Sequence, residues 1–155
     1  MGNSNIIIRE FELNDIETLV KLGKKMHSEG EYSFLPYSKQ KCRDLGKKIK
    51  LIDNANIWVA EVDGKVIGMY IAIVTEYFFN YEKIAQDYLL YIDKEYRKDI
   101  KIPIRLVKKA EAWAREQGAK EFCPGSSMNF SSGKLEKFYN FMKFKTVGHL
   151  FKKRL

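Results

Sequence analysis

Residues 87–119 decide the fold, and they read DYLLYIDKEYRKDIKIPIRLVKKAEAWAREQGA. The segment Asp87–Ile92 is short, apolar and aromatic and is followed by charged residues, a pattern typical of a β-strand. Pro103 suits the first turn of a helix, because the N–H that proline lacks has no partner there. Apolar residues then recur at helical spacing: Leu106, Val107, Ala110, Trp113 and Ala114. Gly118 is a typical helix stop, so the stretch predicts a strand, a turn and a helix over Pro103–Gln117.

The turn between this strand and this helix is basic, since it carries Arg97, Lys98 and Lys101. The free N–H groups at a helix N-terminus and the helix dipole favour a bound anion, and formal positive charge adds to that attraction. The stretch therefore predicts a phosphate site as readily as it predicts an ordinary strand–helix unit with a solvated basic turn.

Further predicted elements flank this unit on both sides. The Asp63-Gly64 pair is a strong hairpin signal between the strands Ile57–Val62 and Val66–Tyr77. The other predicted strands are Ile6–Glu10, Glu121–Cys123 and a terminal Thr146–Lys153. The other predicted helices begin at Leu13 with Asn14 as the cap, run from a Ser38 cap to about Ile52, and run from a Ser132 cap to about Phe141. This order favours an α/β protein of three layers, with a mixed, mostly antiparallel sheet flanked by helices.

The composition is that of a packed globule. The chain has 155 residues, of which 45% are hydrophobic and 14% aromatic, and this fits one domain over residues 1–155. No apolar run is long enough to cross a bilayer, and the N-terminus lacks the layout of a signal peptide. Cys42 and Cys123 form no metal-spacing motif, and the chain has only His27 and His149 besides them. We therefore expect free thiols in the cytoplasm and no metal site.

Positive charge is concentrated in the later part of the chain. The net charge is +8, and the residues from Lys94 onward hold sixteen Lys and Arg against six Asp and Glu. Such a surface could bind a nucleic acid, an acidic partner or a polyanionic cofactor, or it could consist of solvated lysines. Nucleic-acid binding is the least supported of these, because no groove-reading motif or RNA-stacking signature accompanies the charge.

Four segments resemble, in their order and spacing, parts of one known family. Residues 57–68 resemble its central hairpin, and residues 91–97 resemble the strand and turn that lead to its arginine-x-x-glycine-x-glycine/alanine motif, which opens here at Arg97. Residues 111–119 resemble the end of its third helix, and residues 138–144 resemble its phenylalanine-tyrosine-x-x-x-glycine-phenylalanine helix end. The chain thus resembles the GNAT N-acetyltransferases over nearly its whole length, and most of all their short phage-encoded members.

This resemblance implies that the chain binds acetyl-CoA as a co-substrate. The implied cofactor-binding residues are Leu90, Tyr91 and Ile92 for the pantetheine, and Arg97, Lys98, Asp99, Ile100, Lys101 and Ile102 for the pyrophosphate. The glycine motif is degenerate, because Lys98, Ile100 and Ile102 stand where the family usually has glycine, glycine, and glycine or alanine, respectively. Those glycines let the backbone approach the pyrophosphate. The two isoleucines either point away from the ligand or block its site.

Acetyl transfer requires a positioned amine, removal of its proton and protonation of the leaving thiolate. The resemblance implies that Tyr139 protonates the CoA sulfur, although an aromatic residue here also suits a hydrophobic core. Ser132 lies where relatives carry a cofactor-contacting asparagine, and it equally suits a helix cap. Gln86 stands where some relatives have a glutamate base. The base therefore stays open among Asp87, which alternation turns to the other sheet face, Glu61, Glu29, Glu31 and a water chain.

The loop His27–Tyr37 lies where this family usually holds its acceptor. The loop is acidic and aromatic, in contrast to the basic cofactor side, and its candidate acceptor-binding residues are Glu29, Glu31 and Tyr32. Carboxylates attract an amine and aromatic rings can face a cation, which is consistent with a primary-amine acceptor. The alternative is a loop that packs its aromatic side chains into the core.

Together these patterns predict an acetyl-CoA-dependent N-acetyltransferase that moves an acetyl group by direct transfer to a primary amine of a small molecule or a protein. The main alternative is a catalytically degenerate protein of the same fold that binds an acyl-CoA or a protein partner without turnover. Both hypotheses are compatible with a homodimer, and neither involves a membrane.

Overall fold

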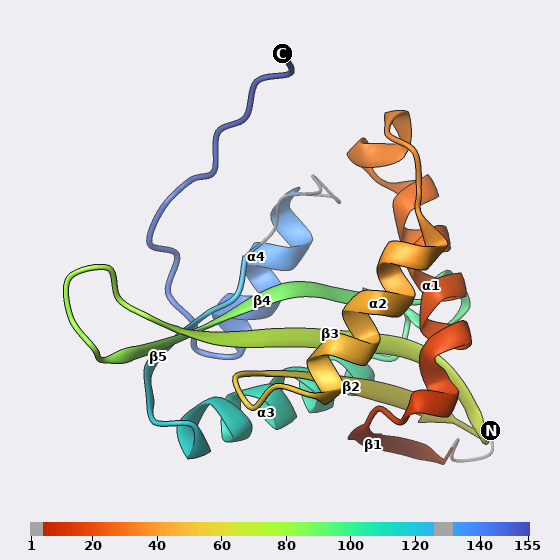
Figure 1. The fold of residues 1–155 in the computed structure, drawn as a ribbon, viewed down its shortest axis with the longest axis horizontal. Coiled ribbons are helices and arrows are strands. Elements are labelled where there is room, and N and C mark those ends of the chain that lie inside the picture. Colours follow the sequence, from red (N-terminus) through yellow and green to blue (C-terminus); the bar gives the residue numbers. More distant parts are fainter. Residues whose placement is uncertain (1–4, 126–131) are drawn as a thin grey trace.

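A computed structural model describes residues 5–125 and 132–155, with Ser132 described by its backbone alone. Within these residues the chain forms five strands and four α-helices (Figure 1). The strands are β1 (Ile6–Glu10), β2 (Ala55–Val62), β3 (Lys65–Glu76), β4 (Lys83–Ile92) and β5 (Ala119–Cys123). The helices are α1 (Ile16–Glu29), α2 (Lys39–Lys50), α3 (Lys101–Glu116) and α4 (Ser132–Phe141), with short 3-10 helices η1 (Leu13–Asp15), η2 (Glu31–Phe34) and η3 (Lys94–Tyr96). The predicted α/β class is confirmed.

The sheet has the strand order β1-β2-β3-β4-β5. Neighbouring strands pair antiparallel except β4 and β5, which are parallel because α3 carries the chain back between them. The β2–β3 hairpin turns at Asp63, with φ of 49°, and Gly64, with φ of 80°. Both turn residues have a left-handed backbone conformation, as a type I′ turn requires, so the hairpin predicted from Asp63-Gly64 is confirmed.

Side-chain alternation along β3 separates two hydrophobic cores. Met69 and Ile71 pack among residues of α1 and α2, whereas Tyr70 and Ala72 pack among residues of α3. Side chains of α4 also join the second core. The result is the predicted three-layer arrangement, with α1 and α2 on one face of the sheet and α3 and α4 on the other (Figure 1).

Strand β4 changes register halfway along its length. Two consecutive residues of β3 lie opposite Leu89 and Asp87, so Tyr88 is an extra, bulged residue. Strand β5 pairs only with Lys83–Gln86. Among the described residues, the later half of β4, Asp87–Ile92, therefore has no strand beside it on its outer edge.

The first helical segment begins differently from the predicted helix with Asn14 as its cap. Residues 13–15 form η1, and a capping box joins Glu12 to Asp15, whose Oδ2 accepts the Glu12 N–H at 2.7 Å. The cause is Arg9, whose guanidinium donates hydrogen bonds of 2.8 and 3.0 Å to the Asp15 carboxylate. The helix also runs further than predicted, because α1 continues to Glu29 and leaves only η2 and its flanks as the connection to α2.

The predicted terminal strand Thr146–Lys153 is wrong. Residues 145–155 form neither a helix nor a strand, and they run as an extended segment away from the sheet (Figure 1). A strand needs a neighbour to pair its backbone groups, and no backbone hydrogen bond joins this segment to the described strands. Its apolar side chains are consequently exposed: Val147 is 85% and Phe151 88% accessible to solvent.

The end of α4 is strained at one residue. Lys143 has a φ of 67°, and the next residue closes the helix by donating its N–H to the Tyr139 carbonyl at 2.9 Å. This left-handed position favours glycine, because a side chain there costs roughly 1–2 kcal/mol. We predict that Lys143→Gly raises the free energy of unfolding by about 0.5–1 kcal/mol and Tm by about 1–4 °C in thermal unfolding. Lys145→Gly is the matched control and should not stabilise the protein; equal effects of the two changes would contradict the assignment.

Candidate active site

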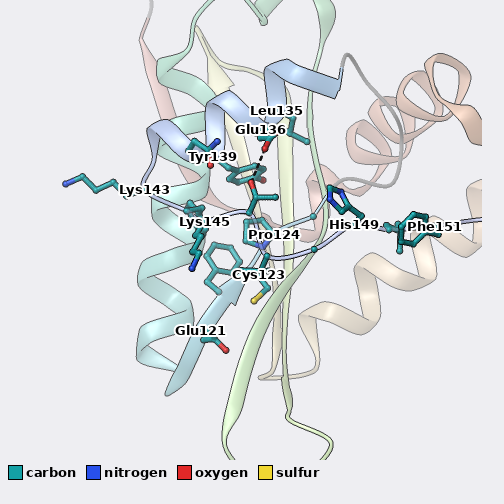
Figure 2. A pocket seen from close by; sticks show the side chains of 18 of the residues that line it. Glu121, Cys123, Pro124, Leu135, Glu136, Tyr139, Lys143, Lys145, His149 and Phe151 are labelled. Carbon is teal, nitrogen blue, oxygen red and sulfur yellow. Dashed lines mark hydrogen bonds between the residues drawn. The ribbon is translucent and has the colours of Figure 1, made fainter.

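An open cavity of about 960 Å³ lies between β5, α4 and the C-terminal segment (Figure 2). Cys123 and Gly125 line it from the end of β5, Tyr139 lines it from α4, and His149 lines it from the C-terminal segment. The cavity thus lies at the level where the pairing of β4 with β5 stops.

Tyr139 belongs to a cluster of polar side chains at the wall of this cavity. The Tyr70 hydroxyl interacts with that of Tyr139, and it donates a long hydrogen bond of 3.4 Å to Asp87 Oδ2. The other carboxylate oxygen of Asp87 accepts the Gly125 N–H at 2.9 Å. Burial raises the pKa of Asp87 to about 6, although the hydrogen bonds from Gly125 and Tyr70 act in the opposite direction. Burial, and then the Asp87 charge, also raise the pKa of Tyr139.

Sequence reasoning did not bring Asp87 and Tyr70 together with Tyr139. Alternation turns Asp87 away from the face of Gln86, and the face that it turns to is the one that carries α3 and α4. A signal was present, because Tyr70 lies in the middle of an apolar strand, where a buried tyrosine hydroxyl needs a partner.

The residues predicted along the pantetheine form the unpaired part of β4. Leu90 and Ile92 direct their side chains into the core beneath α3, whereas Tyr91 packs on the opposite face. Their backbone lies at the free edge, and one of its groups is already used, since the Ile92 carbonyl accepts a hydrogen bond of 2.7 Å from Arg97 Nε. An extended ligand could bind along this edge in the way that an additional strand would pair with it.

Arg97 links the basic turn to the end of α1. Its Nη2 donates to Glu29 Oε2 at 2.7 Å, and the Tyr91 hydroxyl donates to Glu29 Oε1 at 2.8 Å. Burial acts to raise the pKa of Glu29, but the hydrogen bonds from Arg97 and Tyr91 outweigh it, so this pKa is lowered. Glu29, predicted on the acceptor side, is therefore held by two residues predicted on the cofactor side.

The N-terminus of α3 is less open than its sequence suggests. The Asp99 carboxylate accepts the Lys101 N–H at 3.0 Å, and the Asp99 carbonyl accepts the Ile102 N–H at 3.2 Å. Two of the N–H groups expected to be free for phosphate thus have partners within the chain. The Ile102 side chain is buried in the core and points away from any ligand at the turn, whereas Ile100 is 54% exposed. The side chains of Lys98 and Lys101 are exposed beside it.

The other predicted acceptor residues, Glu31 and Tyr32, lie in η2. Both contact the C-terminal segment, where Lys152 forms an ion pair with Glu31 and lies 4.7 Å from the centre of the Tyr32 ring. Tyr37 instead packs on α1, and its hydroxyl donates to the Val20 carbonyl at 2.9 Å. The loop therefore combines a packed aromatic residue with an accessible acidic and aromatic surface.

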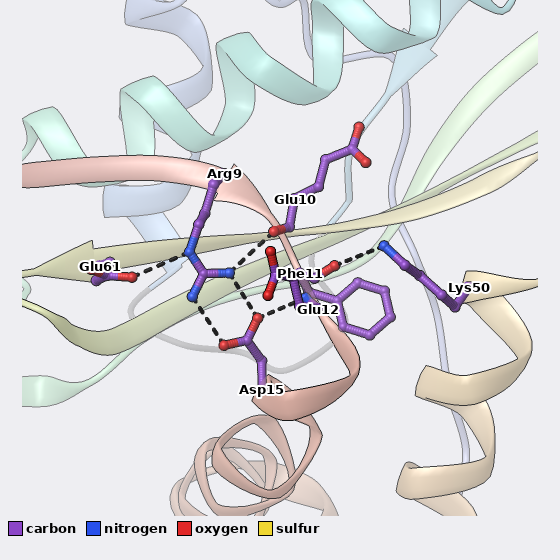
Figure 3. Close-up of polar contacts among 7 residues, drawn as sticks. All are labelled: Arg9, Glu10, Phe11, Glu12, Asp15, Lys50 and Glu61. Atoms are coloured by element: carbon purple, nitrogen blue, oxygen red, sulfur yellow. Dashed lines mark hydrogen bonds and ion pairs between the residues drawn. The ribbon is translucent and has the colours of Figure 1, made fainter.

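Of the other base candidates, Glu61 lies outside the cavity. Figure 3 shows it on β2, where its Oε2 accepts a hydrogen bond of 3.2 Å from Arg9 Nε. Arg9 also holds Asp15, and its hydrogen bond is the main cause that lowers the Asp15 pKa. This cluster fixes β1 to η1 and has a structural role. The side chain of Ser132, predicted either as a cofactor contact or as a cap, lies outside the described residues.

Residues 5–125 and 132–155 contain no group of three or more histidine, cysteine, aspartate or glutamate side chains that could hold a metal ion. None of their helices is both long and apolar enough to span a bilayer.

The partly buried Asp87 carboxylate should make stability depend on pH. The pKa of Asp87 in the folded protein is about 6, above the ordinary 3.8, so the folded state holds the proton more tightly than the unfolded state. The resulting contribution to the free energy of unfolding is complete below the unfolded pKa and is lost as the pH rises through about 6. This loss is worth about 2–3 kcal/mol. We predict that Asp87→Asn, compared with wild type by urea unfolding, gains this amount of relative stability between about pH 4 and pH 7. Asp53→Asn, at an exposed position, is the control; parallel pH curves for wild type and Asp87→Asn would contradict the burial argument.

Known proteins share this architecture. A model of the Acetyltransferase (GNAT) family matches residues 24–137, whereas no curated protein matches the chain. The fold is similar to AAC(6′)-Iy in complex with the bisubstrate analog CoA-S-monomethyl-acetylneamine, with a TM-score of 0.80 at 15% identity over 98% of this chain and 99% of that chain. It is also similar to glucosamine-6-phosphate N-acetyltransferase from Arabidopsis thaliana, with a TM-score of 0.76 at 15% identity over 97% and 98% of the two chains.

A third similar structure is a transcriptional regulator from Bacillus halodurans C-125, with a TM-score of 0.77 at 22% identity over 97% of this chain and 100% of that chain. At such identities the solved structures establish the fold, whereas the family model covers more than half of the sequence. The chain belongs to the GNAT family of acetyltransferases.

Proposed function

We propose that this protein is an acetyl-CoA-dependent N-acetyltransferase that moves the acetyl group directly to a primary amine. The observation that carries the proposal is the edge of Leu90–Ile92, which no described strand pairs, together with a cavity that Tyr139 lines at the end of β5, where the pairing of β4 with β5 stops. An extended pantetheine at this edge would bring its thioester toward a proton donor. Structural neighbours support the choice of ligand, since AAC(6′)-Iy has been solved with CoA and with a CoA-linked aminoglycoside analog.

In the proposed reaction the neutral amine attacks the thioester carbonyl, and the tetrahedral intermediate expels the CoA thiolate. Backbone N–H groups at the β4 edge would stabilise the oxyanion, and Tyr139 would protonate the departing sulfur. Tyr70, whose hydroxyl donates to Asp87, would hold the Tyr139 hydroxyl in place. The amine would lose its proton to water or to a carboxylate near the cavity.

Cationic side chains at the turn before α3 would hold the phosphates of CoA. Lys98 and Lys101 are exposed and free to move toward a ligand, whereas Arg97 already donates to Glu29 and to the Ile92 carbonyl. The lysines are therefore the main phosphate contacts in this proposal, and Arg97 keeps the turn in place.

The acceptor is proposed to be an amine of a small molecule or a protein, held on the side of η2. Two similar structures are aminoglycoside acetyltransferases, and one of them is bound to sisomicin, which is consistent with a small-molecule amine acceptor. Cys42 and Cys123 are unpaired, and this supports the cytoplasm as the compartment.

A binding protein without turnover is the second candidate, and Asp99 favours it. Its carboxylate occupies the N-terminus of α3, where a phosphate would otherwise accept the Lys101 N–H. No binding of acetyl-CoA, or binding without transfer to any amine in a panel, would support this candidate over the enzyme.

The first test concerns the turn. The double change Lys98→Glu with Lys101→Glu should weaken the binding of CoA by about 1–3 kcal/mol, because charge-assisted contacts to phosphate are lost. Isothermal titration calorimetry measures this affinity. The matched control is Lys108→Glu with Lys109→Glu, which alters the net charge equally at exposed positions further along α3. If both folded variants bind CoA as wild type does, the turn is not part of the site.

The second test concerns Tyr139. Tyr139→Phe retains the ring and its packing against Phe138 and Phe144 but removes the proton donor. We predict a fall in kcat of about 10²-fold, measured as CoA thiol release, with CoA affinity and Tm nearly unchanged. Normal turnover in this variant would leave Tyr139 as a core aromatic residue.

A further inference from the structure

The C-terminal segment places two of its cationic side chains on η2. Lys152 forms an ion pair with Glu31 and faces the Tyr32 ring. Arg154 lies over the Phe34 ring, with its guanidinium carbon 3.7 Å from the ring centre. The two cations are two residues apart, and so are the two rings that they contact.

This surface has the chemistry of a cation site. A carboxylate and an aromatic face together neutralise and cover an ammonium group, and a second aromatic face suits a guanidinium or another ammonium. The Phe34 ring is 52% exposed even though Arg154 covers part of it. Alternate side chains of an extended chain lie on one side at a separation of about 7 Å. The surface therefore selects two positive charges at roughly that spacing.

The contacts made by the segment are suited to displacement. The Lys152 and Glu31 side chains retain 45% and 38% of their exposure, so their attraction is screened by solvent. The segment has no secondary structure that would hold it in place. A ligand with the same pattern of charges could therefore replace it, but it would compete with a cationic segment tethered to the same molecule, whose effective concentration is high.

We propose that η2 binds a ligand with two cationic groups about 7 Å apart, and that Lys152 and Arg154 occupy this site as an intramolecular competitor. Polyamines and basic peptide segments share this chemistry. The identification of this ligand as the acetyl acceptor rests on the proposed function, whereas the binding site itself does not.

The test is calorimetric titration of the full chain without acetyl-CoA, using three probes. Spermidine represents a polyamine, a peptide with the sequence of residues 146–155 represents a basic chain, and butylamine is a single-charge control. The variant Lys152→Ala with Arg154→Ala removes the competitor. The variant Lys134→Ala with Lys153→Ala removes the same charge from exposed positions and is the matched control.

We expect spermidine or the peptide to bind the Lys152/Arg154 variant about three- to tenfold more tightly than wild type, with the Lys134/Lys153 variant like wild type. Adding Glu31→Gln to the Lys152/Arg154 variant should reverse the gain, and butylamine should bind weakly throughout. Whichever of spermidine and the peptide binds more tightly identifies the source of the ligand. Equal affinity in wild type and the Lys152/Arg154 variant, or a gain that survives Glu31→Gln, would overturn the proposal.

A separate turnover measurement keeps the two proposals distinguishable. The tighter probe is offered with acetyl-CoA, and CoA thiol release is recorded for wild type and the Lys152/Arg154 variant. A lower KM in the variant with kcat unchanged supports the ligand as the acceptor. If the calorimetric gain is present but no thiol is released, the binding site stands and its identification as the acceptor site fails; release with another amine of the panel would leave the acetyltransferase proposal intact.

Discussion

The candidate site depends on one feature of the sheet, which is that parallel pairing between β4 and β5 stops at Gln86 and Cys123. The bulge at Tyr88 changes the register of β4 just beyond this point. The hydrogen bond from Gly125 to Asp87 then ties the chain after β5 to the same position. Beyond it no described strand pairs with the outer edge of β4, and the cavity lies beside the end of β5. If the two strands paired along their full length, the backbone of Leu90–Ile92 would have its partners within the sheet and no edge would remain for a ligand.

A second constraint connects the two sides of the site. Glu29, at the end of α1, accepts hydrogen bonds from Arg97 in the basic turn and from Tyr91 in β4. The η2 surface begins immediately after this residue. An anion that attracts Arg97 would weaken its pair with Glu29, and the Glu29 carboxylate would then add negative charge next to the cation-binding surface of η2. Cofactor and acceptor would then be coupled through a single ion pair, which is a direct electrostatic route between the two sides.

Local signals predicted much of the fold. Asp63-Gly64 determines its own turn, and the pattern from Asp87 to Gly118 gave the strand and α3 within a few residues. Features that depend on pairing between distant segments were not accessible in this way. The cluster of Asp87, Tyr70 and Tyr139 depends on how β3, β4 and α4 lie relative to one another. The prediction of a terminal strand was wrong because no described strand pairs with that segment. The N-terminus of α3 was misjudged for a local reason, since an aspartate two residues before a helix can cap it and so compete with phosphate.

The most direct test of the account is a crystal structure of the protein soaked with acetyl-CoA. The account predicts density for the pantetheine along the outer edge of Leu90–Ile92, with the thioester sulfur within hydrogen-bond reach of the Tyr139 hydroxyl and the pyrophosphate near Lys98 and Lys101. It also predicts that β4 and β5 keep the pairing that ends at Gln86 and Cys123. A crystal that binds acetyl-CoA elsewhere, or in which β4 is paired along this edge and no cofactor binds, would contradict the central claim.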